Sequence, residues 1–204
     1  MRYKLLLLLI NLGLVVGSVF YSQPADACGH EGPYAGIGYT QLLMYTPEHQ
    51  LNPLSSRRIT FGPGYGGHAL FGYDFKGARW GIQMPFEIAR LKLNKSEWVT
   101  YLGSTIEGVF HIKEWSNGFD FHVQGGIGWS YLTEGRDADQ TKSWGITASA
   151  GPGFSYYFAR TEKVSGALAV ELPFRYIYYL GNHLSRNGTS VIALPIRISM
   201  QIGF

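Results

Sequence analysis

The chain contains few of the residues that stabilise most soluble or disulfide-bonded proteins. Only one of its 204 residues is cysteine, Cys28, which excludes a disulfide framework and a cysteine-based zinc site within the chain. Charged residues make up 15%, well below the roughly 25% of a soluble domain. The formal net charge of +3 is too small to indicate nucleic-acid binding. Beyond residue 27, no apolar run is long enough for a membrane-spanning helix.

Aromatic residues and glycine are abundant instead. Aromatic residues make up 15% of the sequence, and there are 27 glycines. This combination with low charge is not that of a disordered chain. The length fits a single domain.

The first residues have the pattern of a secretory signal peptide. Arg2 and Lys4 precede an apolar run of 16 residues, 5–20, and the sequence Ala25-Asp26-Ala27 matches a small-x-small cleavage site. A spanning helix needs about 20 residues, so we favour a signal over an anchor. We expect cleavage of residues 1–27, a short periplasmic segment over 28–33 and a folded domain over 34–204. Cys28 would then begin the mature chain, which leaves a lipid-modified thiol as an alternative.

Alternation of apolar and small or polar residues occurs in eight segments, as in half-buried strands. In the last segment Ile196, Ile198 and Met200 share one face, whereas Arg197 and Ser199 lie on the other. Each segment is about as long as the ~9–11 residues of a tilted membrane strand, or longer. The segments span residues 34–45, 59–75, 79–89, 98–112, 119–132, 144–158, 167–180 and 191–204.

The two faces of these segments indicate a membrane barrel. A soluble barrel would present a polar face rich in Lys and Glu to water, but here the polar face is sparse and consists mainly of Gly, Ser, Thr and Ala. The apolar face is broad and aromatic, as expected where strands contact lipid. Small inward residues suit the narrow interior of eight strands. We therefore predict an all-β, eight-stranded, antiparallel, up-and-down transmembrane β-barrel with a filled polar lumen.

Aromatic residues gather at both ends of the predicted strands, as in the two interfacial girdles of a membrane barrel. The predicted inner girdle comprises Tyr73, Phe75, Trp80, Tyr156, Phe158 and Phe204. The predicted outer girdle comprises Trp98, Trp129, Tyr131, Trp144, Tyr176 and Tyr178.

The chain resembles the small eight-stranded outer-membrane barrels of Gram-negative bacteria, the class typified by OmpA and OmpX. The resemblance rests on the signal peptide, the eight segments and the C-terminal residues 197–204, where Met200, Ile202 and Phe204 alternate with polar or small residues. It implies a location in the bacterial outer membrane among lipid and lipopolysaccharide. It also implies that Met200, Ile202 and Phe204 are read by the barrel-assembly machinery. We expect a monomer of the cell envelope without cofactor or nucleic-acid partner.

Inward-facing charges are the candidate site. Isolated charges in a narrow interior cost several kcal/mol, so they must pair. We predict a glutamate–arginine network that plugs the barrel, formed by Glu87, Glu107, Glu171, Arg175 and Arg197. Pro85, Pro173 and Pro195 each precede one of these charges by two residues. Proline removes a ladder donor, which makes these positions candidates for bulges or bends.

Three inward histidines raise the alternative of a metal site. His111 and His122 flank one predicted turn and could approach each other. Two histidines without a clear third ligand are a weak metal signal. Pairing with Glu107 or Asp120 is the favoured interpretation, and no metal is predicted.

An enzymatic alternative comes from lipid A deacylases, whose pattern is His-x-Ser with an acidic partner further on. His183-Leu184-Ser185 matches the first part, but no Asp or Glu follows Ser185. We therefore predict no enzyme.

A structural or surface-interaction role is favoured over a narrow channel or small-solute carrier and over a lipid A-modifying enzyme. Cations in the predicted outer loops could contact lipopolysaccharide phosphates through charge-assisted hydrogen bonds. They are Arg57, Arg58, Lys95, Arg136, Lys142 and Arg186. Ordinary solvated loop charges are an equal alternative, because acidic residues are interspersed among them.

Overall fold

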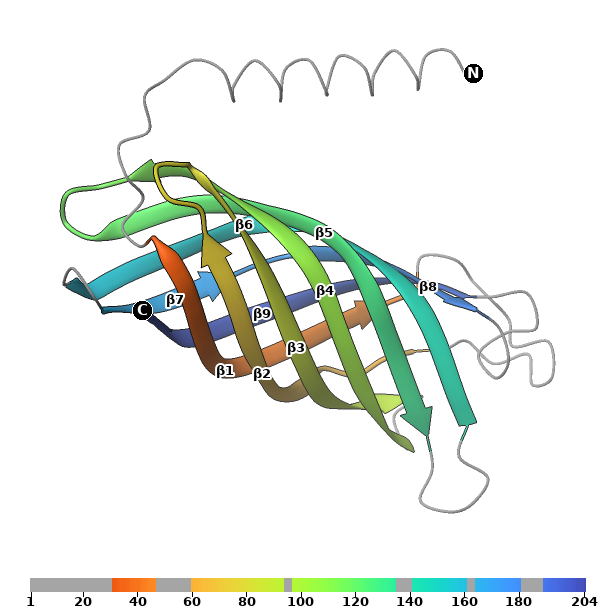
Figure 1. Cartoon of the computed structure of the whole chain (residues 1–204). Helices are drawn as coiled ribbons and strands as arrows, with labels where there is room; N and C mark the ends of the chain where they lie inside the picture. The colour runs from red at the N-terminus through yellow and green to blue at the C-terminus, as the bar shows by residue number, and fades with distance from the viewer. Residues whose placement is uncertain (1–30, 47–59, 94–96, 135–140, 161–163, 181–188) are drawn as a thin grey trace, which may run out of the picture.

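The computed structural model describes residues 31–46, 60–93, 97–134, 141–160, 164–180 and 189–204, and these form strands joined into one sheet. Figure 1 shows the strands tilted around a common axis. The strands are β1 (Gly32–Tyr45), β2 (Gly64–Asp74), β3 (Trp80–Leu93), β4 (Glu97–Glu114), β5 (Phe119–Glu134), β6 (Thr141–Arg160), β7 (Ser165–Glu171), β8 (Phe174–Leu180) and β9 (Thr189–Gly203).

The sheet closes on itself. β7 and β8 lie end to end between β6 and β9, so the nine strands occupy eight positions around the ring. β1 pairs with β9 from Tyr34↔Gly203 to Tyr45↔Ile192, and this pairing joins the two edges of the sheet. Every pairing is antiparallel. The predicted eight-stranded, antiparallel, up-and-down barrel is confirmed.

Two predicted strands are interrupted or shortened in the structure, and proline explains both differences. The segment 167–180 was expected to be continuous, but it breaks at Leu172 and Pro173 into β7 and β8. The segment 59–75 becomes regular only at Gly64, after Pro63, and Phe61 forms just an isolated bridge with Leu93. Proline has no N–H to donate to a ladder, so the strand stops or restarts beside it.

The other two prolines of the predicted set perturb the sheet less. Pairing of β3 with β4 lapses between Gln83 and Phe86, around Pro85, and resumes in the same register. Pro195 keeps its place opposite Leu42 in an uninterrupted register. Bulges lie elsewhere, between His111 and Lys113 in β4 and between Tyr157 and Ala159 in β6.

The barrel carries its apolar face outward. Along β3 and β8, exposed and buried residues alternate, as period-two side-chain geometry requires. The exposed positions hold large apolar side chains, with Ile37 73% and Ile127 71% exposed, whereas buried positions include glutamate, aspartate, histidine and arginine. This is the reverse of a soluble barrel. The described residues contain no helix that is long and apolar enough to span a membrane.

The interior has different chemistry at its two ends. We call the end that holds Gly32 and Phe204 the terminal end, and the opposite end, where β3 ends and β4 begins, the loop end (Figure 1). The loop half is filled by an apolar layer, in which Tyr101 and Tyr179 are the largest members. The other members are Leu42, Met44, Ala89, Leu91, Leu93, Val99, Leu132, Ile177, Val191 and Ala193. The expectation of a polar lumen is therefore wrong for this half, because inward positions near the loop end carry aliphatic and aromatic residues.

Candidate functional site: the ion-pair network of the lumen

The centre of the lumen holds a bidentate ion pair between β8 and β3. Arg175 Nη1 donates to Glu87 Oε2 at 2.6 Å and Arg175 Nη2 donates to Glu87 Oε1 at 2.8 Å. Arg175 Nη1 also donates to the Tyr101 hydroxyl at 3.1 Å, at the edge of the apolar layer. Both charged side chains are almost completely buried. A planar guanidinium matches a carboxylate in this geometry, which makes it a strong form of charge-assisted hydrogen bond.

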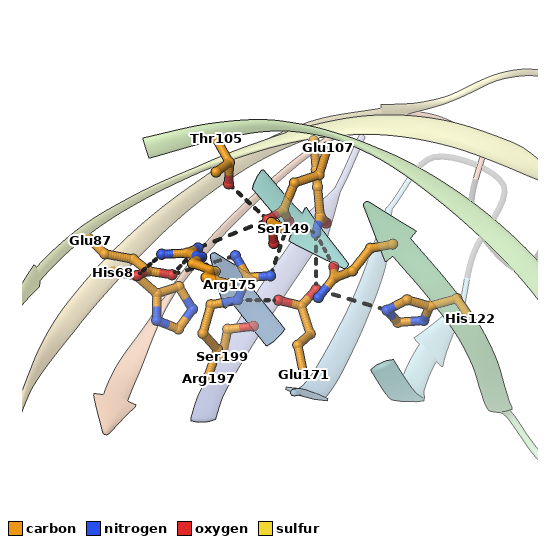
Figure 2. Close-up of polar contacts among 12 residues, drawn as sticks. His68, Glu87, Thr105, Glu107, His122, Ser149, Glu171, Arg175, Arg197 and Ser199 are labelled. Carbon is orange, nitrogen blue, oxygen red and sulfur yellow. Dashed lines mark hydrogen bonds and ion pairs between the residues drawn. The ribbon is translucent and has the colours of Figure 1, made fainter. Parts of the chain in front are cut away.

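Arg197 of β9 joins three carboxylates. Its Nη2 donates to Glu107 Oε2 at 3.0 Å, its Nε lies 2.9 Å from Glu171 Oε2, and its Nη1 lies 3.5 Å from Glu87 Oε1. Arg175 Nη2 adds a longer contact of 3.9 Å to Glu107 Oε1. Figure 2 shows the two arginines between the three glutamates. Strands far apart in sequence are therefore linked across the barrel interior.

Neutral polar side chains complete the network. Thr105 and Ser149 donate to Glu107 Oε1 at 2.7 and 3.0 Å (Figure 2). Gln83 donates to Glu107 Oε2 at 3.0 Å and to Glu171 Oε1 at 3.2 Å, and it also contacts Gln124. Buried carboxylates need such partners because a lone pair left without a donor in the interior is costly.

A histidine–aspartate cluster lies nearer the terminal end. His111 Nδ1 and His122 Nδ1 each lie 3.0 Å from Asp120 Oδ2. On their other sides, His111 Nε2 is 3.4 Å from Asp74 Oδ1, and His122 Nε2 is 3.8 Å from Glu171 Oε1. Glu171 thus contacts both Arg197 and this cluster.

The structure brings together all five members of the predicted network and shows which of them pair. Glu171, on the same face as Arg175, contacts Arg197, and Arg175 turns to Glu87 and Glu107. The break at Pro173 lies between Glu171 and Arg175 in sequence. Of the two partners suggested for the histidines, Asp120 makes the contacts.

Several predicted residues lie outside the part of the chain that the structure describes. These are the signal segment, Cys28, His183, Ser185, Arg57, Arg58, Lys95, Arg136 and Arg186, together with the side chain of Lys142. The proposed assembly-signal residues Met200, Ile202 and Phe204 are described, and their side chains are exposed on the outer face. Their recognition during assembly stays a prediction.

A basic pair at the loop end was not predicted from the sequence. The segment 79–89 was expected to end before Arg90, but β3 continues to Leu93 and presents Arg90 and Lys92 on its exposed face. The Trp98 ring centroid lies 5.6 Å from Arg90 Cζ and 5.2 Å from Lys92 Nζ. The alternation that runs from Trp80 through Ile88 continues through both cations. This continued alternation could have predicted the longer strand.

Gln83, Gln124 and Asp74 were likewise not predicted from the sequence as members of a network. Their phase relative to Glu87, His122 and His68 was visible in the sequence. The sequence does not show which of these residues contact each other, because contacts across a barrel depend on strand stagger and on bends such as the one at Pro173.

Solved structures share this fold. Neisserial surface protein A (NspA) matches with a TM-score of 0.56 over 88% of this chain and 100% of its own, at 14% sequence identity. The fold is that of a small outer-membrane β-barrel. Ail, the attachment invasion locus protein of Yersinia pestis, matches with a TM-score of 0.45 at 15% identity over 84% of this chain and 99% of its own. The N-terminal barrel domain of Pseudomonas aeruginosa OprF gives 0.43 at 14% identity, over 83% and 98%.

These structural neighbours are bacterial outer-membrane proteins, which is the location that the sequence predicts for this chain. No protein-family model matches the chain, and no curated protein matches it. Sequence identity this low relates the folds alone.

Proposed function

We propose that the protein is a non-conducting outer-membrane barrel whose lumen is closed from within and whose role lies at its surface. The observation that carries the proposal is the double closure of the described lumen. The Arg175–Glu87 pair and the contacts of Arg197 occupy its centre. The apolar layer around Tyr101 and Tyr179 fills its loop half. The loop end faces the cell exterior in this proposal.

The two layers oppose ion passage for different reasons. In the centre, an ion would have to displace arginine and glutamate groups from partners at 2.6–3.0 Å. In the apolar layer it would find no charged partner among the described residues, only hydroxyls such as those of Tyr101, Tyr179 and Ser130, and an isolated charge in such surroundings is very costly. Eight strands also leave an interior only just wide enough for side chains. A narrow channel or small-solute carrier is therefore the weaker alternative.

Planar-bilayer recording tests the closed lumen. We expect the purified protein to give no stable single-channel conductance, because both layers would have to open together. Insertion is verified separately by flotation of the protein with lipid vesicles and by its β-sheet circular dichroism. Stable, large openings from inserted protein would contradict the proposal.

A non-enzymatic role is also part of the proposal. The Thr40 hydroxyl lies 2.8 Å from His68 Nδ1, which is the start of a nucleophile–base pair. However, His68 Nε2 is buried and has no hydrogen-bond partner among the described residues, so no carboxylate orients this imidazole. Thr40 and His68 are buried inside the barrel, away from any lipid substrate.

The surface role includes lipopolysaccharide contact. Arg90 and Lys92 are exposed at the loop end of β3 beside Trp98, an aromatic residue suited to the headgroup level. Two cations on an otherwise apolar outward face can reach phosphate groups while their stems lie along the barrel. The loop cations predicted from the sequence would extend this basic band.

Substitution of Arg90 and Lys92 tests this contact. Lipopolysaccharide is expected to stabilise the barrel more than phospholipid does. Arg90→Gln/Lys92→Gln is expected to lose up to about 2 kcal/mol of that gain, since exposed ion pairs contribute ~0.2–1 kcal/mol each. Unfolding by urea in the two vesicle types measures the difference. Lys113→Gln is the matched control, because Lys113 lies over Trp115 at 5.2 Å but toward the terminal end. Equal losses in both variants would contradict a lipopolysaccharide contact at the loop end.

A further inference from the structure

The histidine–aspartate cluster has the geometry of a metal site. His111 and His122 face each other across β4 and β5, and Asp120 precedes His122 by two residues on the same face of β5. Asp120 Oδ2 lies 3.0 Å from both Nδ1 atoms. One possible ligand atom from each of the three residues lies within 4.8 Å of the others.

These separations fit a common metal ion. With metal–ligand bonds of ~2.0–2.1 Å, adjacent ligand atoms of a tetrahedral ion are roughly 3.3 Å apart. The two nitrogen–oxygen distances of 3.0 Å are only a few tenths of an ångström shorter. To hold an ion, these two distances must lengthen slightly, and the two nitrogens, whose separation is bounded only by 4.8 Å, must lie about 3.3 Å apart.

Each imidazole also has a second carboxylate near its far nitrogen. Asp74 Oδ1 lies 3.4 Å from His111 Nε2, and Glu171 Oε1 lies 3.8 Å from His122 Nε2. A carboxylate behind a metal-binding histidine holds the proton on the far nitrogen and directs the near nitrogen's lone pair at the metal. Here both near nitrogens are the Nδ1 atoms that face Asp120.

Two glycines leave room for this arrangement. Gly153 is the cross-strand partner of His122, and a Cβ there would lie 2.1 Å from His122 Nε2. Gly81 is the partner of Asp74, and a Cβ there would lie 2.1 Å from Asp74 Oδ1. The rings and carboxylates of the cluster therefore occupy space that only glycine leaves open.

With neutral imidazoles the cluster also lacks positive charge, and it has an unused ligand atom. The buried carboxylates among the described residues are Asp74, Glu87, Glu107, Asp120 and Glu171, whereas the buried arginines are Arg175 and Arg197. A divalent cation at the histidine end would offset two of the three excess negative charges. Asp120 Oδ1 is buried without a hydrogen-bond partner in the described part of the barrel, so this oxygen is free to contact an ion.

We propose that His111 Nδ1, His122 Nδ1 and the Asp120 carboxylate bind a divalent transition-metal ion of the zinc class, with Asp74 and Glu171 as positioning residues. Two imidazoles and one carboxylate suit zinc, copper, iron or nickel better than calcium or magnesium, which prefer all-oxygen sites. The ion would tie β4 to β5 beside their turn.

Zinc titration of the purified, chelator-treated barrel tests the site. Wild-type protein is expected to bind one more zinc ion per chain than His111→Gln/His122→Gln, and its melting temperature is expected to rise by about 5 °C or more at a hundredfold excess over Kd. Asp74→Asn is expected to weaken zinc binding 10–100-fold, as loss of a carboxylate behind a metal-binding histidine usually does. His68→Gln is the matched control, since His68 is a buried lumen histidine whose Nδ1 contacts Thr40, and it should leave zinc binding unchanged.

Comparison with the double variant separates this site from the other four histidines of the chain. Equal zinc binding by the wild type and the double variant would overturn the proposal and leave Asp120 as the partner of two protonated imidazoles. If the double variant does not fold, X-ray absorption at the zinc edge of wild-type protein decides. Two imidazole nitrogens at ~2.0–2.1 Å are expected, and a shell without imidazole would overturn the site.

Discussion

Arg175→Met is expected to destabilise the barrel by about 3 kcal/mol, because removal of one partner of a buried ion pair leaves an uncompensated charge. Glu87 would lose hydrogen bonds of 2.6 and 2.8 Å and, among the described cations, would keep Arg197 Nη1 at 3.5 Å. Tyr101 would lose its contact with Arg175 as well. Urea unfolding in lipid vesicles, followed by tryptophan fluorescence, measures the free energy of unfolding.

The double variant Glu87→Gln/Arg175→Met makes this prediction specific. It removes the stranded carboxylate charge, so it is expected to be more stable than Arg175→Met alone although it carries one more substitution. Lys76→Met is the surface control and should stay within ~0.5 kcal/mol of wild type, because Lys76 is exposed in a turn. A single variant within 1 kcal/mol of wild type, or a double variant no better than the single, would show that the pair contributes little to stability.

The alternation of apolar and polar residues was enough to predict the barrel, because the prediction required only knowing which side chains face outward and which face inward. Ile196, Ile198 and Met200 alternate with Arg197 and Ser199 without interruption, and the structure keeps that phase. The strand ends were harder to place. Arg90 and Lys92 look like loop residues, yet they extend β3, since cations at the headgroup level are compatible with a lipid-facing strand.

The inside–outside alternation predicted which charged residues face the lumen, but not which of them contact each other. A lumen that is only just wide enough brings inward residues of non-adjacent strands together, so Arg175 of β8 meets Glu87 of β3. Distance along the chain says nothing about such a contact. Glu171 and Arg175 are four residues apart and would lie on one face of a continuous strand, but the break at Pro173 separates them.

Glycine placement carries information that sequence analysis used only in general terms. Several large inward polar residues have glycine directly opposite them on a neighbouring strand. The pairs are Tyr34↔Gly72, His68↔Gly38, Asp74↔Gly81, Glu87↔Gly103, Glu107↔Gly126 and His122↔Gly153. At Gly72 and Gly153, a Cβ would lie within 2.2 Å of the Tyr34 ring and the His122 ring. These two glycines therefore leave room for one particular side chain each, and this becomes visible only once the register is known.

Ile127→Arg is expected to destabilise the barrel in a lipid bilayer by about 2–4 kcal/mol, the cost of a cation on the lipid face at the membrane midplane. Ile127 is 71% exposed and lies near the middle of β5. Tyr45→Arg is the matched control. Tyr45 is 65% exposed at the loop end of β1, where the same cation should cost about 0–1 kcal/mol.

The depth dependence separates lipid contact from ordinary exposure. On a protein in water, arginine at an exposed position would be close to neutral at either site, because surface substitutions usually stay within ~0.5 kcal/mol. Urea unfolding of both variants in the same vesicles measures the two costs side by side. Equal, small effects at Ile127 and Tyr45 would mean that this outward face does not contact acyl chains, and the membrane assignment would then fail together with the roles built on it.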